Sequence, residues 1–380
     1  MAKRRQSGEG TIAQRPGGTW QARISYIDPV TGQRKRVSVD GPTAAAVRTK
    51  MKQARERLEA GGPPRDATHT VAAWLAHWRV TTLMASDPAE STRDTYARLA
   101  RKHLETAPFG EISLGKLRPS DVEGLVLALR AKGLADATIR LIYNVLRVAL
   151  DGAVRDRPLA RNPAALVAWP GVKRGEARHL DTDVVTAVLR AVEDSRYYPA
   201  LVLIASTGVR RGEALALSWD RVDLDAGTLT VAATLGRIGK RLVIRQPKTT
   251  RSRREIPLFP AMVTMLRRHR IAQKEERLRA GDQWTESGLV FTTALGRPIE
   301  PGNMLSRIKK AAAKAGVEDV KVHTLRHSAA VAWLESGVHI KAVSDLLGHS
   351  SIAVTGDVYG HTSDTAARAA IDTLGERLGL

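Results

Sequence analysis

The chain has 380 residues, and its 60 Lys and Arg outweigh 39 Asp and Glu to give a formal net charge of +21. This length predicts more than one domain, and so large a basic excess indicates a polyanionic partner, nucleic acid before a membrane surface. The absence of cysteine excludes disulfides, zinc ribbons and thiol catalysis, and we find neither a membrane-spanning apolar run nor a signal peptide.

Residues 1–66 are predicted to form a small three-stranded sheet followed by one helix. Thr19–Ile27 alternates between apolar and polar residues, and Arg34–Val39 has the pattern of its return strand after a Gly-containing turn. This segment holds fourteen basic and six acidic residues, a net charge of +8. A basic sheet of this size can enter a DNA major groove, although an ordinary solvated surface is the alternative. The candidate DNA-binding residues are Arg34, Lys35 and Arg36.

Residues 67–172 are predicted to form a helical bundle. Apolar residues at helical spacing indicate four amphipathic helices, which begin near Val71, Ser91, Pro119 and Asp136. The tryptophans of this region fit an apolar core better than a platform for base stacking.

Residues 173–380 are predicted to form a mostly helical domain with a small antiparallel sheet. A helix is expected from Asp181, a buried apolar helix over Ala200–Ala205, and further helices from Pro260. We expect one sheet to contain Leu229–Val231, Leu242–Ile244 and Glu255–Leu258. The chain as a whole is therefore predicted to be a multidomain α+β protein.

The stretch Lys321–His361 gathers several imidazoles, a guanidinium and a phenol within a short region. Thr324 is expected to cap a helix, which would put Arg326 in its first turn. A helix N-terminus favours an anion, and a guanidinium adds bidentate donors, so this arrangement suits a phosphate. A serine is expected to cap the short helix that carries Tyr359.

Several motifs, taken in order, resemble the tyrosine recombinase (phage integrase) family over most of residues 175–365. They correspond to the two arginine boxes of the family, its β-hairpin lysine, the following histidine and the nucleophile segment. The motifs are Thr207–Glu213, Lys248 with Arg254–Leu258, His323–His327, Leu347–His349 and Thr355–Tyr359.

This resemblance implies DNA cleavage by a tyrosine nucleophile. Tyr359 would attack the scissile phosphate and leave a 3′-phosphotyrosine and a 5′-hydroxyl, so the bond energy is kept for rejoining. Arg210 and Arg326 would hold the phosphoryl oxygens from two sides. The chemistry would need no metal, ATP or other cofactor.

The resemblance also implies roles for the remaining site residues. Lys248 would protonate the leaving 5′-oxygen, and we favour it over Lys240 on the same hairpin. His323 would assist proton removal from the nucleophile or bond a phosphoryl oxygen, and His349 would donate to the phosphate. Two supporting residues would orient the site: Glu213 and His327.

The resemblance extends to the domains and partners. Residues 1–66 resemble the arm-binding domain of lambda-type integrases, 67–172 would bind the core site, and 173–380 would be the catalytic domain. We expect a homotetramer on double-stranded DNA with core-type and arm-type attachment sites, in the cytoplasm of a bacterial host. A DNA-bending host factor and an excisionase are further expected partners. The alternatives to a phage or mobile-element integrase are a Xer-like resolvase, a type IB topoisomerase and a non-catalytic DNA-binding regulator.

Overall fold

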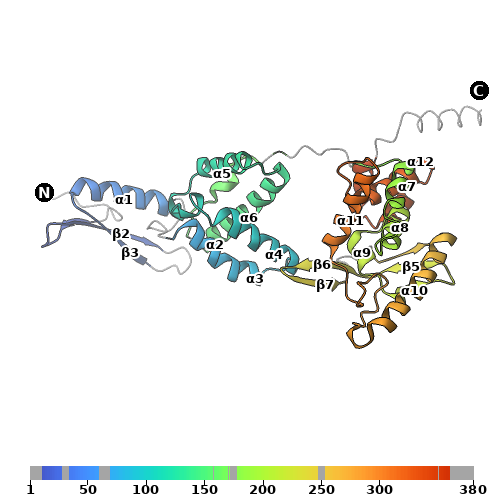
Figure 1. Ribbon diagram of the computed structural model, residues 1–380. Coiled ribbons are helices and arrows are strands. Elements are labelled where there is room, and N and C mark those ends of the chain that lie inside the picture. The colour runs from blue at the N-terminus through green and yellow to red at the C-terminus, as the bar shows by residue number, and fades with distance from the viewer. Residues whose placement is uncertain are drawn as a thin grey trace, which may run out of the picture. The chain divides into compact units, whose positions relative to one another are not determined.

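The computed structural model describes residues 11–27, 34–59, 69–156, 158–169, 171, 178–246, 253–349 and 351–359, with the backbone alone at 57, 59, 354 and 357–359. The chain divides into two compact units, Met1–Lys173 and Arg174–Leu380 (Figure 1). Both are rich in helix, and each contains small antiparallel sheets, which confirms the α+β prediction. Among these described residues, no helix is long and apolar enough to cross a membrane.

The first unit begins with a three-stranded antiparallel sheet in the order β1-β2-β3. Ile24 on β2 lies opposite Val37 on β3, and both are buried with Ala54 of α1. Side chains alternate between the two faces of a strand, so α1 covers one face of the sheet. The elements are β1 (Thr11–Gln14), β2 (Trp20–Ile27), β3 (Arg34–Gly41) and α1 (Ala44–Glu59).

The rest of the first unit is helical, as predicted, and has its own apolar core. Trp74 and Trp78 are 8% and 1% exposed, and Trp74 Nε1 donates a hydrogen bond to Ala149 O at 2.9 Å. Both rings are therefore core residues, and burying each large side chain contributes to holding the bundle together. The helices are α2 (Val71–Val80), α3 (Thr82–Ala85), α4 (Glu90–Leu99), a π-helix (Ala100–Leu104), α5 (Pro119–Ala131) and α6 (Asp136–Arg155).

The second unit is mostly helical. Its helices are α7 (Thr182–Arg190), α8 (Tyr198–Thr207), α9 (Arg211–Leu215), α10 (Pro260–Ala280), α11 (Pro301–Lys314), α12 (Val322–Glu335), α13 (Ile340–Leu347) and α14 (Ile352–Tyr359).

The strands of the second unit form two sheets rather than the single sheet expected from the sequence. One has the order β4-β5-β8, and the other is the separate hairpin β6-β7. The expected strand near Leu242 therefore pairs with a strand that the sequence did not reveal. The strands are β4 (Val222–Asp223), β5 (Thr228–Val231), β6 (Thr234–Ile238), β7 (Arg241–Arg245) and β8 (Arg254–Pro257).

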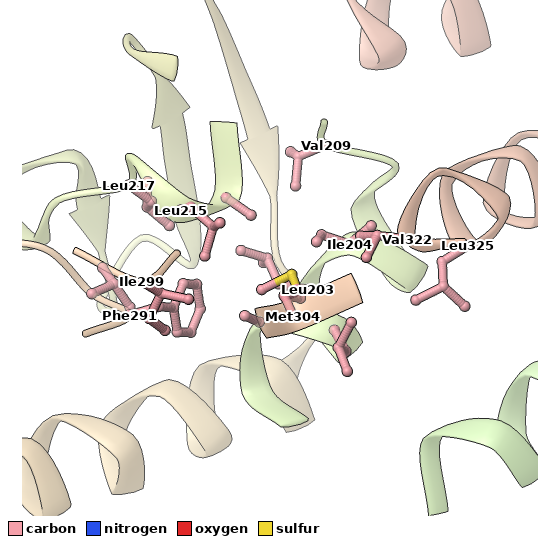
Figure 2. Close-up of a cluster of buried hydrophobic side chains, with 14 of the residues drawn as sticks. Leu203, Ile204, Val209, Leu215, Leu217, Phe291, Ile299, Met304, Val322 and Leu325 are labelled. Atoms are coloured by element: carbon pink, nitrogen blue, oxygen red, sulfur yellow. The ribbon is translucent and has the colours of Figure 1, made fainter. Parts of the chain in front are cut away.

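The core of the second unit joins the helices that carry the two arginine boxes. Leu203 of α8, Leu215 of α9 and Met304 of α11 are fully buried within it, and Val322 and Leu325 of α12 are 2% exposed or less (Figure 2). Each fully buried side chain of this size stabilises the fold by about 1.5–3 kcal/mol. This packing fixes the α8–α9 turn and the start of α12 relative to each other.

Candidate active site

The turn between α8 and α9 lies against the end of α13 because Gly208 has no side chain. Gly208 has φ +62°, and a Cβ added there would lie 2.8 Å from Leu347 Cδ2. Any other residue would be strained in this conformation and would push the two segments apart. The turn ends at Arg210, the residue that precedes α9.

Three arginines from distant parts of the sequence donate to three consecutive carbonyl oxygens at the end of α13. The last carbonyls of a helix lack partners within the helix and carry its negative dipole end, so cations are favourable there. This cluster thus joins the two arginine boxes and β8 to the segment leading to His349. The bonds are Arg254 Nε to Leu346 O at 2.6 Å, Arg326 Nη2 to Leu347 O at 2.9 Å and Arg210 Nη2 to Gly348 O at 3.1 Å.

Glu213 connects two of these arginines. Its carboxylate is 7% exposed and accepts hydrogen bonds from Arg254 Nη2 at 2.8 Å and from Arg210 Nη1 at 2.8 Å. Burial raises the pKa of Glu213, but the hydrogen bonds and charges of the two guanidinium groups outweigh burial and hold the pKa below its usual value. Glu213 is therefore ionised and orients both arginines.

Arg326 and Arg210 differ in their exposure to solvent. Arg326 is 1% exposed and also donates to Gly208 O, whereas the side chain of Arg210 is 39% exposed. Arg210 can therefore meet a ligand from solvent, and Arg326 lies behind it in the protein. The arginines of the two boxes therefore lie close together but at different depths.

The start of α12 differs from the prediction. The N-cap is Lys321 rather than Thr324, and Thr324 Oγ1, three residues inside the helix, accepts a hydrogen bond from Lys321 N at 3.1 Å. Arg326 consequently lies beyond the first turn, with its guanidinium buried. Its position depends on side-chain hydrogen bonds to carbonyls and not on the helix N-terminus.

His349 makes a hydrogen bond through each ring nitrogen. Nε2 lies 2.9 Å from Arg326 Nη2, and Nδ1 lies 2.9 Å from Thr355 Oγ1. Arginine has only donors, so Nε2 accepts and the ring proton sits on Nδ1, from which it is donated to Thr355. Burial, followed by the positive charges of Arg326 and Arg210, lowers the pKa of His349 to about 4. His349 is therefore neutral near pH 7.

His323 and His327 lie edge to face at the start of α12, with ring centroids 4.4 Å apart. Burial, and then the repulsion that His323 exerts when it is itself protonated, lower the pKa of His327 to about 4, so His327 is neutral near pH 7. The His323 side chain is exposed, and partial desolvation followed by the charge of Arg326 lowers its pKa. A neutral, exposed imidazole at this position can accept a proton.

Two predicted site residues fall where the structure gives less detail. Lys248 lies in segment 247–252, outside the described residues. Tyr359 is the last residue of α14, the short helix predicted to carry it, and only its backbone is described. Within the described ranges, no group of three or more His, Asp or Glu side chains is placed to hold a metal ion.

An open pocket of about 590 Å³ lies beside His349. Arg254 lines it together with Arg253, and the acidic Asp345, which also lines it, is paired with Lys341. Its basic lining suits an anion, because both guanidinium groups carry permanent charge.

The sequence interpretation missed two members of the site, Arg254 and Thr355. The Arg254 side chain is 7% exposed, and Thr355 is completely buried. Arg254 precedes the buried Ile256 by two residues, so strand alternation could have placed it on the inward face of β8. Thr355 precedes Tyr359 by four residues, one turn of α14, which places both residues on one side of that helix.

The predicted DNA-binding residues lie on β3. Arg34, Lys35 and Arg36 are all exposed. Since Val37 faces α1, alternation places Arg34 and Arg36 on the opposite face of the sheet and Lys35 on the α1 side. Two of the three residues therefore share the face that α1 leaves uncovered.

The chain is similar in sequence to phage integrases and tyrosine recombinases. Residues 178–366 match the phage integrase family. A XerC-like tyrosine recombinase of Caldanaerobacter subterraneus subsp. tengcongensis is 30% identical over 294 residues, 73% of this chain and 75% of that protein. An integrase of Streptomyces ambofaciens is 29% identical over 367 residues, 94% of each chain.

The fold also has a solved counterpart. A lambda integrase dimer bound to a COC′ core site superposes with a TM-score of 0.61, over 94% of this chain and 96% of that chain. At 19% sequence identity, this likeness is one of fold.

Proposed function

Because the chain belongs to the phage integrase family of tyrosine recombinases and is a site-specific recombinase, we propose that it integrates or excises a phage or other mobile element. It does so by cutting and rejoining double-stranded DNA through Tyr359. The match to the Streptomyces ambofaciens integrase extends into residues 1–66, which supports an integrase with an additional amino-terminal domain.

The proposed reaction exchanges one phosphodiester for another. The Tyr359 oxygen forms a bond to the scissile phosphorus while the bond to the 5′-oxygen breaks, which gives a 3′-phosphotyrosine and a 5′-hydroxyl. The phenolic proton leaves through a base, and the 5′-oxygen receives a proton. Attack by a 5′-hydroxyl on the phosphotyrosine reverses these steps and rejoins the DNA.

The arginine cluster is the observation that carries this proposal. Arg210, Arg254 and Arg326 bring three positive charges, and Glu213 returns one negative charge, while His349 is neutral. The cluster therefore keeps a net positive charge beside an open pocket. Fixed cations that stabilise the charge developing on phosphoryl oxygens are a large part of phosphoryl-transfer catalysis.

The other residues have proton-transfer roles. His323, exposed and with a lowered pKa, accepts the phenolic proton or bonds a phosphoryl oxygen. Lys248 protonates the leaving 5′-oxygen. His349 donates to the phosphate only after DNA binding releases Nε2 from Arg326 and the ring proton moves from Nδ1 to Nε2, whereupon the Thr355 hydroxyl turns to donate to Nδ1.

The proposal includes the domains and partners. Residues 1–66 bind arm-type sites, 67–172 bind core-type sites, and 173–380 carry out catalysis. The protein acts as a tetramer on DNA in the bacterial cytoplasm, where a DNA-bending factor and an excisionase direct it. The basic face of β3 supports the arm-binding assignment.

A nicked duplex carrying the attachment site of the element tests this proposal. The nick lets a short product diffuse away, so the covalent adduct accumulates. The wild-type chain is expected to form a denaturant-resistant adduct at the 3′-phosphate, and Tyr359→Phe is expected to bind the duplex without forming it. An adduct in Tyr359→Phe identifies another nucleophile, and no adduct in wild type rejects the proposal.

A further inference from the structure

His349 obtains its orientation from the helix that carries Tyr359. The partner of its Nδ1 is Thr355 Oγ1 at 2.9 Å, and Thr355 lies on α14. The threonine is 0% exposed, so this bond is shielded from water. A buried hydrogen bond of this kind is costly to leave unmade.

Arg326 selects the tautomer of His349, and Thr355 satisfies the N–H that this tautomer leaves on Nδ1. Arg326 can only donate, so it requires a lone pair on Nε2 and leaves the proton on Nδ1. Without an acceptor at Nδ1, that N–H would be buried and unpaired. The free energy would then be lower if the ring turned or if the proton moved to the other nitrogen. Thr355 removes this alternative because its hydroxyl oxygen accepts a hydrogen bond from Nδ1–H.

We propose that Thr355 is a positioning residue for strand cleavage, which fixes the ring of His349, and its tautomer before DNA binds, only when α14 is in place against α13. The proposal rests on the function proposed above. Thr355 and Tyr359 are one turn apart on one helix, so a displacement of α14 that moves the nucleophile also removes the partner of His349. The orientation of His349 and the placement of Tyr359 therefore both depend on the position of α14.

Two substitutions separate the hydroxyl from the shape of the side chain. Thr355→Val keeps the volume and removes the acceptor, whereas Thr355→Ser keeps the acceptor. In the nicked-duplex assay, we expect Thr355→Val to cleave about tenfold more slowly than wild type at equal DNA occupancy, since a buried donor without a partner costs about 1.4 kcal/mol. Thr355→Ser should restore most of the rate.

Thr292→Val is the matched control. Thr292 is 6% exposed, and its hydroxyl accepts from Gln273 Nε2 at 3.0 Å, away from the arginine cluster. This variant loses a buried threonine hydroxyl, while Gln273 Nε2 keeps Leu289 O and Val290 O as acceptors. Its cleavage rate per folded molecule should therefore stay at the wild-type value.

The tautomer is read directly from the ring nitrogen chemical shifts of His349 in histidine-labelled protein without DNA, assigned by comparison with His349→Gln. Wild type and Thr355→Ser should show a protonated Nδ1 and an unprotonated Nε2, and Thr355→Val should lose this pattern. Unchanged shifts in folded Thr355→Val, or equal cleavage by Thr355→Val and wild type, overturn the inference. Because the spectrum needs no DNA, it decides the positioning role even if wild type forms no adduct and the proposed function fails.

Discussion

The arginines of the amino-terminal sheet occupy an environment opposite to that of the arginines in the second unit, which carries the proposed active site and is called the catalytic unit below. Arg34 and Arg36 are exposed on β3, whereas Arg326 is 1% exposed and bonded to carbonyls of two different segments. The first pair contributes charge without contributing to the stability of the fold, since substitution of an exposed side chain changes the free energy of unfolding little. In the catalytic unit, the same residue type is part of the fold and of the site at once. Substitutions in the two regions should therefore separate binding from stability and chemistry.

The largest effect is expected at Arg326. Arg326→Lys keeps the charge but loses the planar fork that reaches Gly208 O, Leu347 O and His349. Single-turnover cleavage should fall by roughly 10²–10³, as on removal of a transition-state donor, and the thermal midpoint should drop. The exposed Arg267, whose side chain is 55% exposed, supplies the control Arg267→Lys, which should match wild type in both measurements. Wild-type cleavage by Arg326→Lys would contradict this account of the cluster.

The second largest effect is expected at Glu213, because its removal leaves a buried positive charge without its counter-ion. Glu213→Gln is expected to cost about 3 kcal/mol of unfolding free energy, measured by denaturant titration. The matched control is Glu286→Gln, which removes an exposed pair with Arg277 at 3.0 Å and should change stability by less than about 0.5 kcal/mol. Equal losses in the two variants would show that the Glu213 pair behaves as a surface pair.

Acid should destabilise the catalytic unit before it affects the amino-terminal sheet, because residues 1–66 contain no histidine. His327 and His349 have pKa values of about 4 when folded and 6.5 ordinarily. Between these values the unfolded chain binds protons that the folded chain does not, so stability is full above about pH 6.5 and falls as the pH approaches 4.

Hydrogen exchange from pH 7.5 to 4.5 measures this effect region by region. Protection should fall in α12 and α13 and remain in β2 and β3. In His327→Asn/His349→Asn the pH dependence should be shallower, and an unchanged dependence would assign it to other groups.

The smallest effect on the fold is expected from Arg34→Gln/Arg36→Gln. The variant should keep the wild-type thermal midpoint and core-site cleavage. Its binding to an arm-type duplex should weaken, with the log–log salt slope shallower by about 0.9 for each lost phosphate contact. An unchanged slope would remove these two residues from the DNA interface.

Local patterns predicted the elements well. Amphipathic spacing located the helices of 67–172, and the arginine boxes identified Arg210 and Arg326. Strand β6 was missed because Gly236, in the middle of this five-residue strand, interrupts the alternation that marks a strand. The prediction of an N-cap at Thr324 was wrong. The Thr324 hydroxyl lies inside the helix and accepts a hydrogen bond from Lys321 N, and residue preference alone does not determine this register.

The partners within the site could not be predicted in the same way. Arg254 and Leu346 are 92 residues apart, and Arg326 and Gly208 are 118 apart, so their contacts depend on packing of the whole catalytic unit. The sequence shows which residue types are available, whereas tertiary structure decides which carbonyl each guanidinium reaches. The burial of Arg326 and the tautomer of His349 both follow from these long-range contacts.

The end of α13 acts as an internal substitute for the anion that the site is built to receive. Three like charges would repel one another, but three carbonyl oxygens and one carboxylate hold them together before any DNA arrives. Carbonyl oxygens carry only partial charge, so a phosphate can take their place without the release of a bound ion. The electrostatic cost of bringing the guanidinium groups together is thus met once, during folding, and does not recur in each round of cleavage.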